Sequence, residues 1–268
     1  MKTETLLPET EKVREFVRER YGAIAEQSDA SCGCAKTGCC GGAAENYGEK
    51  LGYSAAELAA APEGADLGLG CGNPLAIASI QPGETVLDLG SGAGFDCFLA
   101  ARQLAGTGHV IGVDMTAAMI AKARANARKG GAANVEFRLG EIEALPVADA
   151  SVDLILSNCV INLSPEKARV FAEAFRVLKP GGRLAIADVV ATKPLPVELQ
   201  KKLSAIGACI GGATPLDEMR ALLQGAGFAR VDIVPKESSR AYIAQWTDDA
   251  TAGEFVVSAL ITAYKTAA

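Results

Sequence analysis

The chain contains 268 residues, of which 49% are hydrophobic and 22% are charged. This balance is typical of a globular protein with a sizeable core, and it excludes disorder, collagen-like structure and coiled coil. Acidic side chains outnumber basic ones by 32 to 26, so the formal net charge is -6 and there is no general positive field for a phosphate backbone. We therefore expect no nucleic-acid partner.

The sequence has no apolar run of about 18 residues and no apolar signal core near its start. We therefore expect a cytoplasmic protein with no membrane partner, and a monomer. Eight cysteines and a single histidine are the unusual counts. Because disulfides are rare in the cytoplasm, we expect the cysteines to be reduced thiols with a metal, redox or packing role.

The first 74 residues are predicted to form an appendage. Helical spacing of apolar side chains predicts one helix within the first thirty residues. Residues 31–42 carry four cysteines and four glycines, which is a loop composition. A short helix is expected over 53–61 with Ser54 as its N-cap, followed by a glycine-rich loop over 64–74.

From residue 85 onward, apolar strands alternate with amphipathic helices, which predicts an α/β fold with a doubly wound, Rossmann-like, mostly parallel sheet covered on both faces. The expected strands are 85–90, 109–114, 135–140, 152–158 and 183–190, with helices over 95–103, 119–129 and 167–178. The tail predicts helices over 199–208 and 217–224 and two strands, 230–235 and 255–264, that can pair antiparallel at the sheet edge. We expect three parts, 1–74, 75–192 and 193–268, of which the second is a ligand-binding core.

The sequence DLGSGAGFD, residues 88–96, lies between the first strand and its helix, where glycines allow a ligand close to the backbone. The dinucleotide pattern G-x-G-x-x-G is not met, because Phe95 stands at its last position, and this disfavours an NAD oxidoreductase. Asp114 ends the second strand, where it can accept hydrogen bonds from ribose hydroxyls, and Glu141 with the N–H of Ile142 can contact an adenine edge. A plain tight turn without a ligand is the alternative.

Together these segments, within about residues 80–190, resemble the S-adenosylmethionine-dependent methyltransferases of the Rossmann-like class. The resemblance implies S-adenosylmethionine as cofactor and assigns its binding, within the core 75–192, to Asp88, Gly90, Ser91, Gly92, Gly94, Asp114, Met115, Glu141, Ile142 and Asn158.

Three cysteines are expected at the same edge of the sheet as this loop. Cys159 follows the fourth strand, Cys209 lies in the segment after the fifth strand, and Cys71 lies in the glycine-rich loop. Thiolates are soft ligands that select thiophilic acceptors. An acceptor that carries no proton needs no general base, which fits a chain that is poor in histidine, the commonest general base.

The segments GLGCGNP, SNCVINLSPEKARVFAEAFRVLKPGG and CIGGA resemble the arsenite methyltransferases, in their microbial form. The resemblance implies transfer of methyl groups to arsenite and methylarsenite for detoxification, with a thiol reductant, glutathione or thioredoxin, as electron donor. It also implies that Cys159 and Cys209 hold As(III), that Cys71 is a further ligand and redox participant, and that the third part, 193–268, contributes to the arsenic site. A fourth family cysteine lies near the N-terminus. Of Cys32, Cys34, Cys39 and Cys40, we favour Cys39 or Cys40 as a further arsenic ligand and Cys40 as the catalytic one.

Other interpretations stay open. A methyltransferase acting on a quinone-like or small organic acceptor and a non-catalytic, thiol-rich metal-binding protein are the alternatives. Structural zinc at the N-terminal cysteines is disfavoured, because no second C-x₂₋₄-C pair exists. Cys97 is expected to be a small buried hydrophobe, and His109 an exposed strand end. Asn158 either orients cofactor or substrate or caps a turn.

Overall fold

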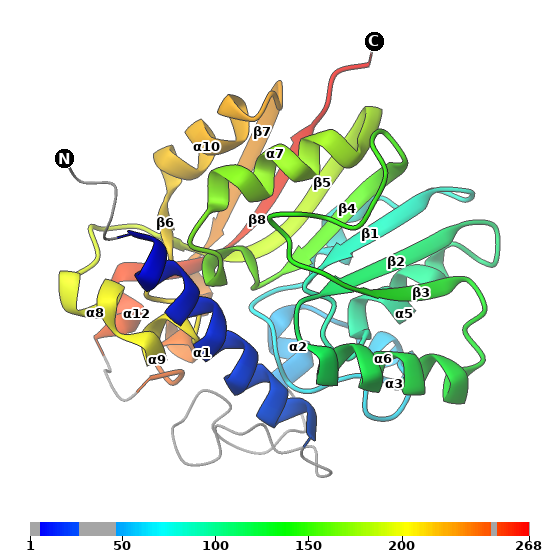
Figure 1. Cartoon of the computed structure of the whole chain (residues 1–268), viewed down its shortest axis with the longest axis horizontal. Helices are drawn as coiled ribbons and strands as arrows, with labels where there is room; N and C mark the ends of the chain where they lie inside the picture. The colour runs from blue at the N-terminus through cyan, green and yellow to red at the C-terminus, as the bar shows by residue number, and fades with distance from the viewer. Residues whose placement is uncertain (1–5, 27–46, 248–250, 268) are drawn as a thin grey trace.

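The eight-stranded sheet at the centre of the molecule is shown in Figure 1. The structure is a computed structural model and describes residues 6–26, 47–247 and 251–267. The strand order is β3-β2-β1-β4-β5-β8-β7, with the short β6 paired to β5. The parallel strands are β1 (Thr85–Leu89), β2 (His109–Asp114), β3 (Val135–Leu139), β4 (Val152–Asn158), β5 (Leu178–Ala191) and β6 (Thr214–Pro215).

Two antiparallel strands complete the sheet. The strand β8 (Val256–Tyr264) pairs with β5 on one side and with β7 (Arg230–Lys236) on the other, both antiparallel. The predicted Rossmann-like fold with late antiparallel edge strands is therefore confirmed. The edge strand β7 precedes β8 in sequence, although β8 is the strand that lies beside β5.

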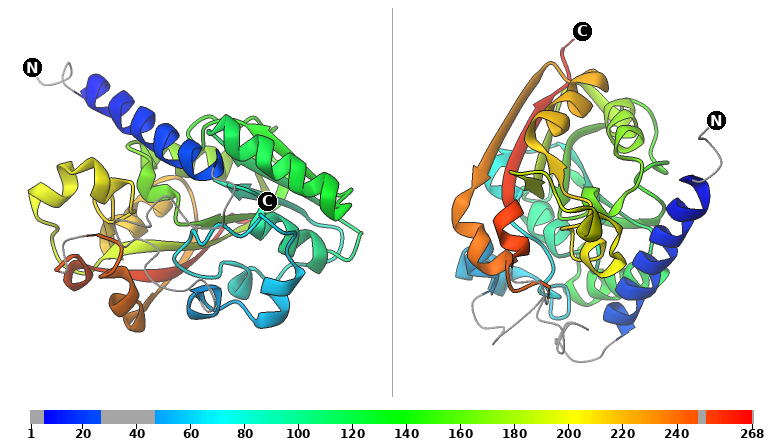
Figure 2. Two further views of the ribbon diagram at one scale, coloured as in Figure 1. Left: turned by 90° about the horizontal axis from the view of Figure 1, so that it is seen from below. Right: turned by 90° about the vertical axis from the view of Figure 1, so that its left-hand side faces the viewer.

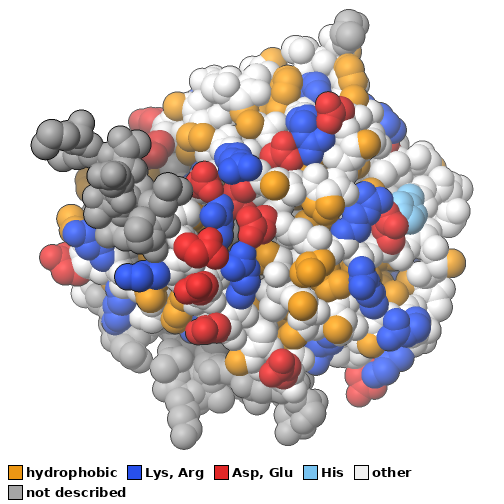
Figure 3. Space-filling model, in the orientation of Figure 1, with side chains coloured by type: hydrophobic (Ala, Val, Ile, Leu, Met, Phe, Trp, Pro, Cys, Tyr) orange, Lys and Arg blue, Asp and Glu red, His pale blue; other side chains and the backbone are white. Residues whose placement is uncertain are grey.

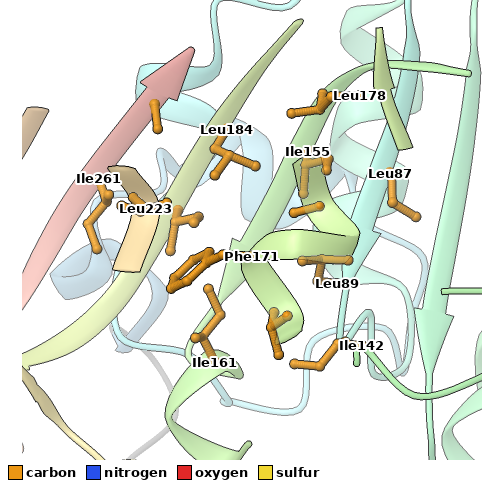
Figure 4. Close-up of a cluster of buried hydrophobic side chains, with 14 of the residues drawn as sticks. Leu87, Leu89, Ile142, Ile155, Ile161, Phe171, Leu178, Leu184, Leu223 and Ile261 are labelled. Carbon is orange, nitrogen blue, oxygen red and sulfur yellow. The ribbon is translucent and has the colours of Figure 1, made fainter. Parts of the chain in front are cut away.

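Alternate residues of the central strands bury two separate apolar clusters, one on each face of the sheet. Leu87 and Ile155 face the first cluster, which includes Phe171 and is drawn in Figure 4. Val86 and Leu154 face the second cluster. Both faces are covered, so the sheet forms the middle layer of three.

The helices divide between these faces. The first cluster lies under α7 (Lys167–Val177) and α10 (Leu216–Gly225). The second lies under α4 (Leu75–Ala78), α5 (Phe95–Gln103) and α6 (Ala117–Gly130). The short helix α3 (Ala55–Ala60) begins as predicted, because Ser54 accepts the Glu57 N–H and Glu57 accepts the Ser54 N–H in a capping box.

The remaining elements gather around the carboxyl ends of the parallel strands. The long helix α1 (Leu6–Glu26) lies on the outside of the molecule against α6, α9 (Leu203–Ile206) and η2 (Ile161–Leu163), as Figure 2 shows. The others are α2 (Tyr47–Leu51), α8 (Val197–Lys201), η3 (Glu237–Ser239), α11 (Arg240–Ile243) and α12 (Ala252–Phe255). The division into 1–74, 75–192 and 193–268 stays a prediction. No helix in the described ranges has the length and apolar character needed to cross a bilayer.

Candidate active site

One cleft at the carboxyl ends of β1, β2 and β4 collects most of the predicted site residues. The helix α1 forms part of its wall. Of the expected cofactor and thiol residues, those that line the cleft are Asp88, Gly90, Ser91, Gly92, Asp114, Met115, Ile142, Asn158, Cys159 and Cys209. Residues distant in sequence therefore meet at the place where parallel sheets bind ligands.

The glycine loop requires glycine at two positions. Gly90 has φ +68° and a Cβ there would lie 2.3 Å from Cγ2 of Val160. Gly94 is the N-cap of α5 with φ +96°, and a Cβ would press on the rings of Phe98 and Phe137. Gly94 therefore allows the loop to pack against these two rings, but it does not line the cleft. Phe95 is the first residue of α5.

Polar groups beside the glycine loop fit the ribose of a bound cofactor. The Asp114 carboxylate accepts the N–H groups of Gly92 (3.0 Å) and Thr116 (2.8 Å), which fixes its orientation, and burial raises its pKa. Ser91 lines the same cleft, and its hydroxyl is buried and has no hydrogen-bond partner in the described part of the chain. Since buried polar groups are nearly always paired, this hydroxyl fits a ligand group that the cleft would hold.

Asn158 connects the cofactor loop to the loop of Cys71. Its Oδ1 accepts the Cys71 N–H (3.1 Å), while its amide group donates to Tyr53 Oη (2.9 Å), Gly72 O (3.0 Å) and Asp96 Oδ2 (3.1 Å). Tyr53 in turn donates to Asp96 at 2.6 Å, and burial raises the pKa of Asp96 to about 6. The sequence analysis missed Tyr53 and Asp96, although Asp96 lies inside the motif.

The three predicted thiols come together. The Cys159 thiol lies beside the thiols of both Cys71 and Cys209, and Cys209 Sγ donates a hydrogen bond to Cys159 O at 2.9 Å. Cys159 and Cys209 both adopt the left-handed backbone conformation, with φ of 58° and 61°. Left-handed non-glycine residues are uncommon and concentrate at functional sites, so the two turns are held in place by their surroundings.

The thiols are protonated at neutral pH. Burial raises the pKa of Cys71 to about 11, and this residue is fully buried behind the cleft. The pKa of Cys209 is raised by its hydrogen bond to Cys159 and by burial. For Cys159 the contact with Cys209 lowers the pKa, but the contact with Cys71 and burial raise it more. The site therefore presents thiols until a ligand replaces their protons.

A buried carboxylate lies beside these thiols. The side chain of Asp188, in β5, is 0% exposed, and burial raises its pKa to about 6. One of its oxygens and the sulfurs of Cys71 and Cys159 lie within 4.8 Å of one another. The sequence pattern did not predict a functional carboxylate here, because Asp188 occupies a strand position where an apolar residue would be expected.

The helix α1 is tied to the loop after β3 by an ion-pair network. Arg14 lies 2.5 Å from Glu166, 3.5 Å from Glu143 and 4.0 Å from Glu141, and Arg18 lies 2.6 Å from Glu141. Charged side chains of both signs gather beside α1 on the face in Figure 3. Glu141 therefore faces α1 and does not line the cleft, whereas Glu143 lines it and accepts a hydrogen bond from Ser164 Oγ (2.6 Å). The adenine contact of Glu141 stays a prediction.

Two predictions about cysteines and one about the single histidine remain. Cys97 is buried and donates to Asp88 Oδ2 (3.2 Å), which confirms the packing interpretation. Cys39 and Cys40 lie outside the described residues, as do Cys32 and Cys34. The only histidine, His109, begins β2 and lies 3.5 Å from Glu136, away from the cleft.

Comparisons with known proteins identify the family of this chain. A family model described as a methyltransferase domain matches residues 80–249. The chain therefore belongs to the methyltransferases. It is 54% identical to an arsenite methyltransferase of Halobacterium salinarum over 264 residues, 96% of this chain and 68% of that protein. That similarity places the chain in the arsenite methyltransferase family.

Two further matches support the same family. An arsenite methyltransferase of Aquipseudomonas alcaligenes is 46% identical over 166 residues, 59% of this chain and 47% of that protein. The crystal structure of an arsenic(III) S-adenosylmethionine methyltransferase from Chlamydomonas reinhardtii matches with a TM-score of 0.63 and 33% identity, covering 82% of this chain and 74% of that one. The chain thus spans between about half and three quarters of these relatives.

Proposed function

We propose that this chain transfers methyl groups from S-adenosylmethionine to trivalent arsenic held by Cys71, Cys159 and Cys209. The observation that carries the proposal is the contact of these three thiols, from three separate segments, at a cleft that also contains the glycine loop. The unpaired Ser91 hydroxyl and the oriented Asp114 carboxylate support cofactor binding at that loop.

The protein's own groups explain how the acceptor would bind. Arsenous acid exchanges its three hydroxyl groups for three thiols, and each thiol proton leaves with a hydroxyl group as water. Binding therefore releases no net proton, and the raised pKa values of the thiols do not oppose it. Cys159 and Cys209 line the cleft and Cys71 lies behind Cys159. Three sulfur ligands leave the arsenic lone pair free, and we infer that it points into the cleft.

When bound, S-adenosylmethionine supplies an electrophilic methyl group and a neutral thioether leaving group. The chain's contribution is proximity and orientation, because the acceptor has no proton for a base to remove. The arsenic lone pair forms the new bond to carbon, and arsenic becomes formally pentavalent. Two of the three sulfur ligands then leave arsenic as one disulfide: two As–S bonds break, one S–S bond forms, and the two electrons stay on arsenic, which returns to the trivalent state. The methylated arsenic keeps its bond to the third sulfur and takes a hydroxide from water, whose proton goes to solvent.

A thiol reductant, either a small thiol such as glutathione or a thioredoxin-type protein, would reduce that disulfide for the next cycle. The cytoplasm would keep the thiols reduced, and the cysteines in the described segments are free. An N-terminal cysteine, Cys39 or Cys40, remains our candidate for an additional participant.

The test is product speciation with the purified chain, arsenite, methyl-labelled S-adenosylmethionine and a thiol reductant. The proposal predicts labelled methylarsenicals. Without the reductant, their formation should stop after the first turnover. Label found only in an organic acceptor, or bound metal without any methyl transfer, would contradict it.

A further inference from the structure

Asp188 has no task in the proposed methyl transfer, yet it belongs to the thiol cluster. Within the described residues, its carboxylate and the sulfurs of Cys71 and Cys159 form the one group of three potential metal ligands that lie within 4.8 Å of one another. Arsenic(III) needs three sulfurs and takes the third from Cys209, so the carboxylate offers a different ligand set at the same place.

The carboxylate is oriented by its own hydrogen bonds. Asp188 Oδ1 accepts from Asn162 Nδ2 (2.9 Å) and the Val189 N–H (2.7 Å), and Oδ2 accepts from the Ile161 N–H (3.0 Å). A carboxylate offers about four lone-pair sites, so these bonds leave one on Oδ2. Hydrogen-bonded support of this kind is what holds ligating carboxylates at metal sites.

We propose that Cys71, Cys159 and Asp188 form a site for a thiophilic divalent cation, Zn²⁺ or Cd²⁺, that excludes arsenic(III) from the same thiols. Tetrahedral Zn²⁺ accepts sulfur at about 2.3 Å and carboxylate oxygen at about 2.0–2.2 Å. Neighbouring ligand atoms then lie about 3.5–3.8 Å apart, so the distances between the three ligand atoms, now within 4.8 Å, shorten by at most about 1.3 Å. On binding, the two thiols release their protons to solvent and Asp188 binds ionised.

In this site, water occupies the fourth coordination position of the cation. Cys209 Sγ is held on Cys159 O at 2.9 Å and is not part of the group with Asp188. The two kinds of ion therefore share Cys71 and Cys159 and differ in the third protein ligand. Exclusion of arsenic rests on the proposed function, whereas the cation site itself does not.

The experiment is a Cd²⁺ titration followed by the ultraviolet thiolate-to-cadmium charge-transfer band. The full reduced chain is used with its four N-terminal cysteines, Cys32, Cys34, Cys39 and Cys40, changed to serine, which removes thiols that would bind Cd²⁺ independently. Arsenite binding is followed in the same protein by quenching of Trp246, the single tryptophan, which lines the cleft.

Two variants separate the ligand sets. Asp188→Asn is expected to weaken Cd²⁺ binding by about 10- to 100-fold while arsenite still quenches Trp246. Cys209→Ser is expected to retain the Cd²⁺ affinity and to lose arsenite binding. Cys97→Ser, a buried thiol outside the cluster, is the matched control and should keep both.

Unchanged Cd²⁺ affinity in Asp188→Asn would overturn the inference, and so would loss of Cd²⁺ binding in Cys209→Ser. If Asp188→Asn does not fold, the Cys209→Ser titration and X-ray absorption of the Cd²⁺-loaded parent decide. Two sulfurs with oxygen neighbours support the site, and three sulfurs refute it. Failure of arsenite to bind the chain with all eight of its cysteines would instead contradict the proposed function, and the Cd²⁺ titration would still test the cation site.

Discussion

Two arginines one turn apart on α1 give a direct test of how that helix is held over the cleft. The Arg14 side chain is 15% exposed and faces Glu143, whose side chain is 5% exposed and lines the cleft. The Arg18 side chain is 35% exposed and pairs with a similarly exposed Glu141. Arg14→Gln and Arg18→Gln remove the same charge and keep the helix propensity, so the two variants differ mainly in how deeply the lost ion pair is buried.

The expected magnitudes differ accordingly. Breaking a buried ion pair costs about 3–5 kcal/mol, but Glu143 keeps its bond from Ser164, so we expect Arg14→Gln to lower the free energy of unfolding by about 1–3 kcal/mol. An exposed pair contributes about 0.2–1 kcal/mol, which is the range expected for Arg18→Gln. At about 2–4 °C per kcal/mol, the Arg14 variant should lose between about 2 and 12 °C in Tm.

Thermal unfolding and calorimetric titration with S-adenosylmethionine measure both effects. Because Arg14, Val17 and Tyr21 of α1 line the cleft, the Arg14 variant should also bind S-adenosylmethionine more weakly, by about 5- to 30-fold if 1–2 kcal/mol of the loss falls on the bound state. Equal stability losses in the two variants, or an unaltered affinity in Arg14→Gln, would refute this reasoning.

Three further predictions concern two glycines and one buried carboxyl group. Gly90→Ala should abolish S-adenosylmethionine binding in calorimetry, because the added Cβ would lie 2.3 Å from Val160 at a left-handed φ; retained binding would show that the loop adapts. Gly212→Ala should lower Tm and weaken arsenite quenching, because its Cβ would lie 2.0 Å from the carbonyl oxygen of Asn162; an unchanged Tm contradicts it. Burial raises the pKa of Asp96 to about 6 from 3.8, so the folded state holds its proton to higher pH than the unfolded chain, and the unfolding free energy should fall by about 1–3 kcal/mol as pH rises from 4 to 6. Asp96→Asn should flatten that slope in urea unfolding, and an identical slope would exclude Asp96 as its source.

The sequence predicted the parallel sheet and the meeting of Cys71, Cys159 and Cys209 because both depend on local patterns. Buried strands show as short apolar runs, and topology sends the carboxyl ends of parallel strands to one edge. The position of β8 between β5 and β7 is a long-range pairing that periodicity alone leaves open.

What the sequence did not reveal depends on packing between distant segments. The approach of Arg14 to Glu143 joins residues far apart in the chain, and the burial of Asp188 among thiols has no periodic signature. Burial and their mutual contacts keep the three thiols protonated before a ligand binds. Protonation depends on neighbours in space, so it required the folded structure.

The central claim is that thiols at the cleft hold the arsenic during methyl transfer. It is tested most directly by measuring arsenite methylation by Cys159→Ser and Cys209→Ser beside Cys97→Ser, with S-adenosylmethionine binding measured in each. The account predicts methylation at background level in the first two variants, near-normal methylation in the third, and cofactor binding preserved in all. Methylation at the unmodified rate in either Cys159→Ser or Cys209→Ser would contradict it.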